Sequence, residues 1–409
     1  MELAKSNKNY KYYGWYVVFL NALIGCTLSA GFPQSSMTIP FLSDRMNVSQ
    51  ELLLTADTVK TAGIVMAMFL SGFAYRKYGS VKTFLFSMLS AVVPLVVIPY
   101  VRYIPFLFML KFIQGFSSII YPVFLIIIMD WIPENRIGLS TAVFNGIFYG
   151  GAGIGATFAG FVISRFGWVE SYFTLALVQV AVSSIWLLTV RERDGKMPAN
   201  HVRNHHVPLT KLMAKPVVWL LALGFLSTTW SVQVISVDMP LFASYLGFDE
   251  METGKIMSAA TMGIFFACAV SGNISDIASR KSVSKLDSRT AVFSIGCLIV
   301  IISVAVILIS NLNNFLVFYF AVLLFSFGAA WGLGSFYSIL PEIFNEETLP
   351  VATGFIGGCG DIGMVSAPVI VGVLFGAKGL WSMAWGICAL IGVLSFSACL
   401  MIIKLRKWR

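Results

Sequence analysis

Residues 290–311 read TAVFSIGCLIVIISVAVILISN, a stretch of 22 residues without a charged side chain. About 20 mostly apolar residues in a helix are enough to cross the hydrocarbon core of a bilayer. A helix also satisfies every backbone N–H and C=O group within the segment itself, which the interior of a membrane requires. This stretch therefore predicts a transmembrane helix.

Segments of the same kind recur along the whole chain. The 409 residues are 58% hydrophobic and 11% charged, whereas about a quarter of the residues in soluble domains are charged. The first segment is not expected to be a cleaved signal peptide, because its apolar stretch is too long and more helices follow it. We expect an all-α polytopic membrane protein with twelve transmembrane helices, at residues 14–38, 52–75, 81–102, 104–130, 138–164, 168–190, 216–244, 252–275, 290–311, 314–338, 349–376 and 380–403.

The basic residues indicate an orientation. If both termini are cytoplasmic, 21 of the 28 Lys and Arg residues fall at the inner side and five at the outer side. Inner loops of membrane proteins carry such an excess. We therefore expect a multi-pass protein of the cell membrane with cytoplasmic termini. The net charge of +9 follows from the same rule, so it does not indicate binding to nucleic acid.

Neither the cysteines nor the histidines indicate a metal or a cofactor. All six cysteines lie in apolar segments without ligand spacing, and we interpret them as reduced packing residues. The three histidines (His201, His205 and His206) lie in one polar connection. A metal site there is the alternative, but a solvated linker is favoured.

The chain has an internal duplication. The sequence GFAYRKYG at residues 72–79 returns as GNISDIASRK at residues 272–281, and glycine-rich segments occupy matching places at 145–155 and 354–363. The longest polar connection, residues 191–215, lies between the two copies. We expect an N-terminal six-helix bundle at 1–190, a cytoplasmic linker at 191–215 and a C-terminal bundle at 216–409. Duplicated bundles are typical of rocking transporters.

These motifs resemble a known family. The two repeated loops are similar to the signature G-x-x-x-D-R/K-x-G-R/K-K of the major facilitator superfamily, and Lys111-x-x-Gln114-Gly115 resembles its R-x-x-Q-G motif. The runs YGWY at 13–16 and DWIPENR at 130–136 resemble the branch of organic-anion and carboxylate carriers that includes the oxalate–formate exchangers. The resemblance covers nearly the whole chain and implies the twelve-helix fold of that superfamily.

The chain departs from the family pattern at three places. Arg76 replaces the aspartate of the first loop signature, Lys111 replaces an arginine, and the first helix has no ionisable residue in its apolar core. The eighth helix also lacks a cation at mid-depth. The paired cations of the exchangers are therefore not evident, which weakens any transfer of their substrate to this chain.

Two ionisable residues inside the predicted helices are the first candidates for function, because such residues are expensive in a membrane. Asp361 could take up and release a proton during transport, or it could be a fixed charge paired with a lysine. Lys111 shares a helical face with Gln114, Ser118 and Tyr121, and a cation beside such donors suits a carboxylate. The alternative is a snorkelling lysine near the end of its helix.

A further set of polar and aromatic residues lies on helices that line the cavity in the superfamily. A few polar groups in an apolar lining orient a small ligand, although each residue alone is more often a packing contact. The set is Gln34, Asn145, Tyr149, Trp230, Gln233, Trp331, Ser335 and Tyr337.

Several charged residues are expected to act in gating. Asp57 and Lys60 are three apart and could pair locally, or Lys60 could reach Asp361. Because helix N-termini favour negative charge, we predict that Glu346 or Glu347 caps the eleventh helix and pairs with Arg76. Asp276 is expected to have the corresponding role at the fifth helix, near Arg136.

The sequence predicts a secondary active transporter and not an enzyme, because it has no P-loop, GxSxG or HExxH motif. We expect a small organic anion, with a carboxylate as the first choice, carried by alternating access and coupled to protons. The alternative is a proton-driven exporter of cationic or amphipathic compounds, with Asp361 as counter-ion and Trp230, Trp331 and Tyr337 as an aromatic cage. A monomer in the bilayer suffices for either mechanism.

Overall fold

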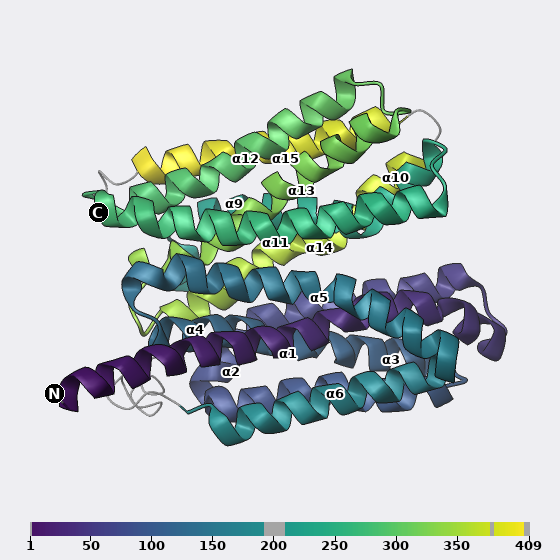
Figure 1. Ribbon diagram of the computed structural model, residues 1–409, viewed down its shortest axis with the longest axis horizontal. Helices are drawn as coiled ribbons and strands as arrows, with labels where there is room; N and C mark the ends of the chain where they lie inside the picture. The colour runs from purple at the N-terminus through teal and green to yellow at the C-terminus, as the bar shows by residue number, and fades with distance from the viewer. Residues whose placement is uncertain (1, 192–208, 377–379, 405–409) are drawn as a thin grey trace. The chain divides into compact units, whose positions relative to one another are not determined.

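The computed structural model describes residues 2–191, 209–376 and 380–404, and every regular element in these ranges is a helix (Figure 1). The N-terminal half contains α1 (Glu2–Met46), α2 (Gln50–Val97), α3 (Ile104–Gly115), α4 (Tyr121–Trp131), α5 (Ile137–Phe166) and α6 (Trp168–Thr189). The C-terminal half contains α8 (Leu209–Met213), α9 (Pro216–Gln233), α10 (Met239–Tyr245), α11 (Glu250–Lys281), α12 (Lys285–Ile309), α13 (Phe315–Ser335), α14 (Leu349–Gly376) and α15 (Trp381–Lys404).

The number of apolar helices agrees with twelve membrane crossings. Among the described residues, 11 helical stretches are long and apolar enough to cross a membrane. The longest, Leu52–Tyr100, has 49 residues and is interrupted at Gly79, whose φ of 80° and ψ of 176° are not helical. Glycine adopts this conformation without the steric penalty of a Cβ atom. Dividing the stretch at Gly79 gives the twelve expected crossings.

Two crossings contain local changes of helix type. The fourth crossing passes from α3 to α4 through a short 3₁₀ helix, η2 (Phe116–Ile120), and the seventh passes from α9 to α10 through a π-helical segment, η4 (Val234–Asp238). A 3₁₀ helix turns 120° per residue and an α-helix 100°. Five such residues therefore rotate α4 by about 100° relative to a continuous helix.

The chain forms two compact units. The first contains residues 1–133 and 147–206, and the second contains residues 134–146 and 207–409. The first residues of α5 thus group with the second unit. The expected linker at 191–215 lies mostly outside the described residues, together with the three histidines, so those boundaries stay a prediction.

In the first unit, glycines bring two helices together where polar residues cluster. A Cβ atom added to Gly115 would lie 2.3 Å from the backbone oxygen of Lys60, and one added to Gly63 would lie 2.5 Å from the backbone oxygen of Phe112. Only glycine permits this approach. The backbone contact therefore holds Lys60 of α2 beside the end of α3, where Gln114 is located.

In the second unit, α9 packs against α14 around a buried hydrogen bond. Thr229 Oγ1 donates to the backbone oxygen of Gly360 at 2.6 Å. The next residue along α14 is Asp361, whose side chain is buried. The packing of these two helices therefore fixes the position of the acidic residue.

Candidate functional site

An ion pair ties three helices of the first unit together. Lys111 Nζ of α3 lies 2.7 Å from Asp57 Oδ1 of α2, and it also donates to Ser35 Oγ of α1. The Ser35 hydroxyl lies 2.9 Å from Asp57 Oδ1. The Lys111 side chain is 4% exposed and that of Asp57 26%. The predicted ion pair between Asp57 and Lys60 is not formed among the described residues. The Asp57 carboxylate binds Lys111 and Ser35 instead.

Lys60 is a second buried cation in the same unit. Its side chain is buried, and its Nζ atom lies 3.9 Å from the centroid of the Phe32 ring. Within the described ranges it forms no ion pair. Lys111 repels a charge on Lys60 and Asp57 attracts it, so the two amines and the carboxylate form one electrostatic group.

A small pocket lies beside this group. It has a volume of about 20 Å³ and is lined by Lys60, Phe32, Gln114, Ser118 and Gln179, among others. We call it the Lys60 pocket. Its volume is enough for one water molecule. The side-chain oxygens of Gln114 and Gln179 are buried there without a hydrogen-bond partner, and such groups are costly unless a ligand or water satisfies them.

The four residues of the predicted polar face of the fourth helix have different surroundings in the structure. Gln114 and Ser118 line the Lys60 pocket, while Lys111 is engaged by Asp57. Tyr121 is buried and its ring packs edge-on against Phe148 at 5.1 Å. The rotation through η2 accounts for Tyr121, which follows this segment, because the spacing that places four residues on one face holds only for a continuous α-helix. Lys111 and Gln114 both precede η2 on α3, so their different contacts have another origin.

The other predicted lining residues of the N-terminal half make packing contacts. Gln34 Nε2 lies 3.4 Å from Ser171 Oγ, and Asn145 Nδ2 donates to the backbone oxygen of Leu333 at 2.7 Å. Tyr149 is half-buried, with its ring 5.1 Å from that of Phe148. None of these three lines the Lys60 pocket.

The aromatic residues of the C-terminal half are also held by their neighbours. Trp331 Nε1 donates to the backbone oxygen of Val292 at 2.7 Å, and Ser335 Oγ donates to the backbone oxygen of Trp331. The ring of Tyr337 packs against Phe225 at 5.2 Å. These contacts fit a structural role, so an aromatic cage made from Trp331 and Tyr337 gains no support.

Three further predicted residues lie on α9 and α14. Trp230 is buried, and its indole N–H has no hydrogen-bond acceptor among the described residues. Gln233 is half-buried at the end of α9. Asp361 is 5% exposed and forms no hydrogen bond or ion pair with any residue in the described ranges. Asp361 is therefore a buried acid without a counter-charge in the described structure.

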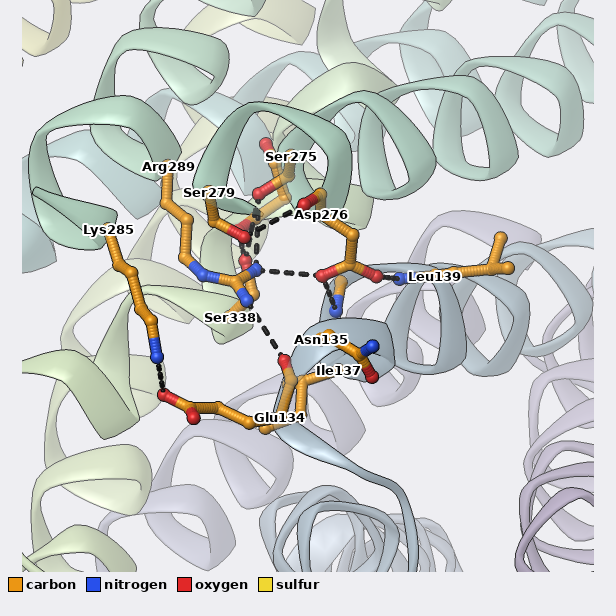
Figure 2. A network of polar contacts seen from close by, with 12 residues as sticks. Glu134, Asn135, Ile137, Leu139, Ser275, Asp276, Ser279, Lys285, Arg289 and Ser338 are labelled. Atoms are coloured by element: carbon orange, nitrogen blue, oxygen red, sulfur yellow. Dashed lines mark hydrogen bonds and ion pairs between the residues drawn. The ribbon is translucent and has the colours of Figure 1, made fainter. Parts of the chain in front are cut away.

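The second unit contains a polar network at the start of α5 (Figure 2). Asp276 accepts hydrogen bonds from the backbone N–H groups of Gly138 at 2.9 Å and Leu139 at 2.8 Å. It also forms an ion pair with Arg289 Nη1 at 3.1 Å, and both side chains are 1% exposed. We call this group the Asp276 network. The carboxylate satisfies amide groups that every helix start leaves unpaired, and it meets the positive end of the helix dipole.

Further contacts of Arg289 and of two other basic residues extend this network. Arg289 Nε lies 3.3 Å from Glu342 Oε1, and its Nη2 donates to the backbone oxygen of Glu134. Arg280 donates twice to the backbone oxygen of Asn135, and Lys285 pairs with the Glu134 carboxylate. The segment just before α5 is therefore bound by both its side chains and its backbone.

The sequence placed Asp276 at the start of the fifth helix, and the structure has it there. The expected partner Arg136 differs, because the ion pair is made by Arg289. Arg136 is half-buried in the turn that precedes α5. Arg289 lies 13 residues after Asp276, in the first turns of α12, where its guanidinium can reach Asp276 and Glu342 together.

The charge swap at the first loop signature stays a prediction. Arg76 is half-buried in the first unit, and Glu346 and Glu347 lie before α14 in the second unit, exposed and half-buried respectively. At the start of α14, the side chain of Asn345 accepts from the backbone N–H of Thr348 at 3.1 Å. The hydrogen bond described at this helix start thus comes from Asn345.

Sequence reasoning missed three buried polar residues: Gln179 of the Lys60 pocket, Arg289 of the Asp276 network, and Asp238 at the end of η4. Asp238 is the only charged residue in the predicted helix 216–244, and this alone could have identified it. Arg289 was counted as a loop charge one residue before a predicted helix. Gln179 had no signal, because one amide in an apolar helix is usually a packing contact. No cluster of metal-binding side chains occurs among the described residues.

Comparison with known proteins gives a consistent assignment. A family model described as Major Facilitator Superfamily matches residues 17–284. A probable nitrate transporter of Staphylococcus carnosus is 24% identical over 385 residues, which cover 90% of this chain and 92% of that protein. The "Probable anion transporter 4, chloroplastic" of Oryza sativa is 23% identical over 217 residues, and the match covers 48% of this chain and only 36% of that protein.

A solved structure has the same fold. The crystal structure of the human organic anion transporter MFSD10 (TETRAN) matches with a TM-score of 0.70, over 95% of this chain and 99% of that chain. The sequence identity is 13%, so the match establishes the fold alone.

Proposed function

This chain belongs to the major facilitator superfamily of membrane transporters, and on that premise we propose that it carries a small organic anion across the membrane by alternating access. It is a transporter and not an enzyme. The substrate class and the coupling to protons are the parts that we propose.

The observation that carries the proposal is that the first unit buries two lysines beside one carboxylate. Lys60 and Lys111 are both buried, whereas Asp57 supplies one carboxylate, and that carboxylate is bound by Lys111. Buried charges are stable only when they are paired or hydrogen-bonded. A monovalent anion in the Lys60 pocket would complete the balance.

The lining of the pocket suits a small oxyanion such as a carboxylate. Lys60 offers an ammonium group and Ser118 a hydroxyl. The unpaired atom of Gln114 is its amide oxygen, so the amide would have to rotate for its NH₂ group to donate to an anion. Hydrogen bonds from charged donors to carboxylate oxygens are roughly twice as strong as neutral ones. The pocket is small in this structure, so binding would require it to widen. The names of the similar proteins, which include nitrate and anion transporters, agree with an anionic substrate.

The proposal changes the residue assigned to the substrate. Sequence reasoning favoured Lys111, but Lys111 has a carboxylate partner at 2.7 Å, so we assign the substrate charge to Lys60 and a structural role to the Asp57–Lys111 pair. Asp361 stays the proposed proton-coupling acid, since a buried acid without a counter-charge can change its protonation state during the cycle.

The topology is part of the same proposal. The excess of basic residues on one side of the predicted helices supports cytoplasmic termini in the cell membrane. A monomer of two six-helix bundles suffices for rocking between inward-open and outward-open states.

Transport into proteoliposomes tests the proposal. Uptake of radiolabelled formate, acetate, oxalate and nitrate is measured under a pH gradient that drives protons into the vesicles. Uptake of at least one of these anions is expected in the natural protein. It should be lost in Lys60→Gln and kept in Lys255→Gln, which removes an exposed lysine of α11.

A double variant separates the two lysines. Asp57→Asn combined with Lys111→Gln removes the ion pair without leaving an unpaired charge, so uptake should persist if Lys60 holds the anion. Loss of uptake in a folded double variant would assign the substrate to Lys111 instead.

A second candidate function rests on the buried acid of α14. The partnerless carboxylate of Asp361 could bind a cationic solute in a proton-driven exporter. Efflux of a lipophilic cation that is lost in Asp361→Asn, with no anion uptake in the natural protein, would favour this alternative.

A further inference from the structure

A second buried acid of the C-terminal unit lies at a break in the seventh crossing. Asp238 is the last residue of the π-helical segment η4 and is 3% exposed. π-Helical turns interrupt α-helices rarely and often occur at functional sites. An acid at such a position is not needed to form the helix, and its burial requires an explanation.

The carboxylate of Asp238 has no partner in the described structure. Its Oδ2 atom is buried without a hydrogen bond, and no ion pair involves this residue among the described side chains. The thiol of Cys388 on α15 is the neighbouring titratable group, and it also lies near the indole of Trp230. The indole N–H acts on this thiol but forms no full hydrogen bond to an acceptor of the described residues. An acid, a thiol and an indole therefore form one buried cluster.

No cation from the surrounding helices neutralises this cluster. The elements that pack most closely against η4 are α9, α10, α11 and α14, and α15 contributes Cys388. α9 contains no ionisable residue, and Tyr245 of α10 and Lys255 of α11 are exposed. α14 contributes Cys359 and Asp361, neither of which interacts electrostatically with Asp238. Among the described residues, no positively charged group therefore offsets the burial of the Asp238 carboxyl group.

A carboxylate in such surroundings must be neutralised by a bound proton or a bound cation. A hard metal cation takes about six oxygen ligands, whereas the neighbours identified here offer an N–H group and a thiol. We infer that Asp238, with Trp230 and Cys388 around it, is a proton-binding site of the transporter, distinct from Asp361. The carboxyl group is neutral while it is buried as in this structure, and it releases its proton when the seventh crossing rearranges.

Infrared spectroscopy tests this inference without a transported substrate. The C=O stretching band of protonated carboxyl groups is recorded for the protein in nanodiscs through a pH titration. The natural protein should show a protonated component that disappears as the pH rises. The part of this component that Asp238 contributes should be absent from Asp238→Asn, in which the part from Asp361 remains. It should be kept in Asp238→Glu and in Asp44→Asn, which removes an exposed acid of α1.

Two outcomes would overturn the inference. Identical titrations of the natural protein and a folded Asp238→Asn variant would show that Asp238 holds no proton. Loss of the component on adding sodium ions at constant pH would identify a metal-cation site instead. If Asp238→Asn fails to fold, the Asp238→Glu variant still tests the inference. Its protonated band should disappear at a different pH from that of the natural protein, and an unchanged titration would contradict the inference.

A second readout rests on the proposed function. With nitrate or formate as the probe, Asp238→Asn should still exchange internal for external anion but should not accumulate it under a pH gradient. Full accumulation in the variant would contradict a role in coupling. If neither anion moves in the natural protein, the proposed function fails while the infrared result still stands.

Discussion

Replacing Asp57 by asparagine should strongly destabilise the first unit. The substitution keeps the size of the side chain but leaves the Lys111 ammonium, which is 4% exposed, without its carboxylate. Removing one partner of a buried pair costs about 3–5 kcal/mol. Because the Asp57 side chain is 26% exposed, we expect the lower end, about 3 kcal/mol. This corresponds to roughly a hundredfold change in the unfolding equilibrium.

The reciprocal variant should be milder. Lys111→Gln leaves Asp57 with the Ser35 hydroxyl at 2.9 Å and with access to water, so we expect a loss of about 1–2 kcal/mol. The double variant Asp57→Asn, Lys111→Gln leaves no buried charge of this pair without its partner, so it should be more stable than Asp57→Asn alone. Such a coupling between contacting residues is what a double-mutant cycle measures.

Reversible unfolding in mixed detergent micelles measures the four proteins of this cycle. The expected order of stability places the natural protein first, Lys111→Gln and the double variant next, and Asp57→Asn last. If the double variant is no more stable than Asp57→Asn, the two side chains are not coupled. The assignment of a structural role to Lys111 would then be refuted.

Three other substitutions test the second unit and the first loop signature. Gly272→Ala should reduce stability by about 1–3 kcal/mol, because the added Cβ would lie 2.3 Å from a neighbouring methyl group. Gly254→Ala meets nothing within 4 Å and should leave stability unchanged or raise it by up to about 1 kcal/mol in the same thermal-unfolding assay. Arg289→Gln should lower the melting temperature far more than Lys285→Gln, since the first breaks a pair that is 1% exposed and the second a pair with side chains 45% and 63% exposed; equal shifts would contradict this. Arg76→Asp should abolish proteoliposome uptake, and normal uptake would remove the predicted charge swap.

The fold could be predicted from sequence because each crossing is decided locally. A stretch such as 290–311 must be helical in a membrane whatever its neighbours are, and the structure has a helix at 285–309. The break at Gly79 lies between the two predicted helices that it separates. Hydropathy could not reveal the 3₁₀ and π segments, because a change in helical winding leaves the composition of a crossing unchanged.

The candidate site was predicted only in part, because its contacts join distant residues. Lys60 is three residues from Asp57 in the sequence, which suggests a local ion pair. The lysine that pairs with Asp57 is instead Lys111, which is 54 residues from it. Spacing along one helix cannot show which of two lysines faces a carboxylate. The same limit applies to Asp276: its place at the fifth helix followed from the motif, whereas its pairing with Arg289 depends on how α11 and α12 pack.

The most direct test of the account is anion binding by purified protein, because the central claim is that Lys60 is the spare buried cation. Affinities for formate and nitrate are measured by isothermal titration in the natural protein, in Lys60→Gln, and in the Asp57→Asn, Lys111→Gln double variant. A charge-assisted hydrogen bond contributes about 1.5–3 kcal/mol, so Lys60→Gln should bind roughly 10- to 150-fold more weakly, while the double variant keeps its affinity. Unchanged binding in Lys60→Gln, with binding lost in the double variant, would contradict the account.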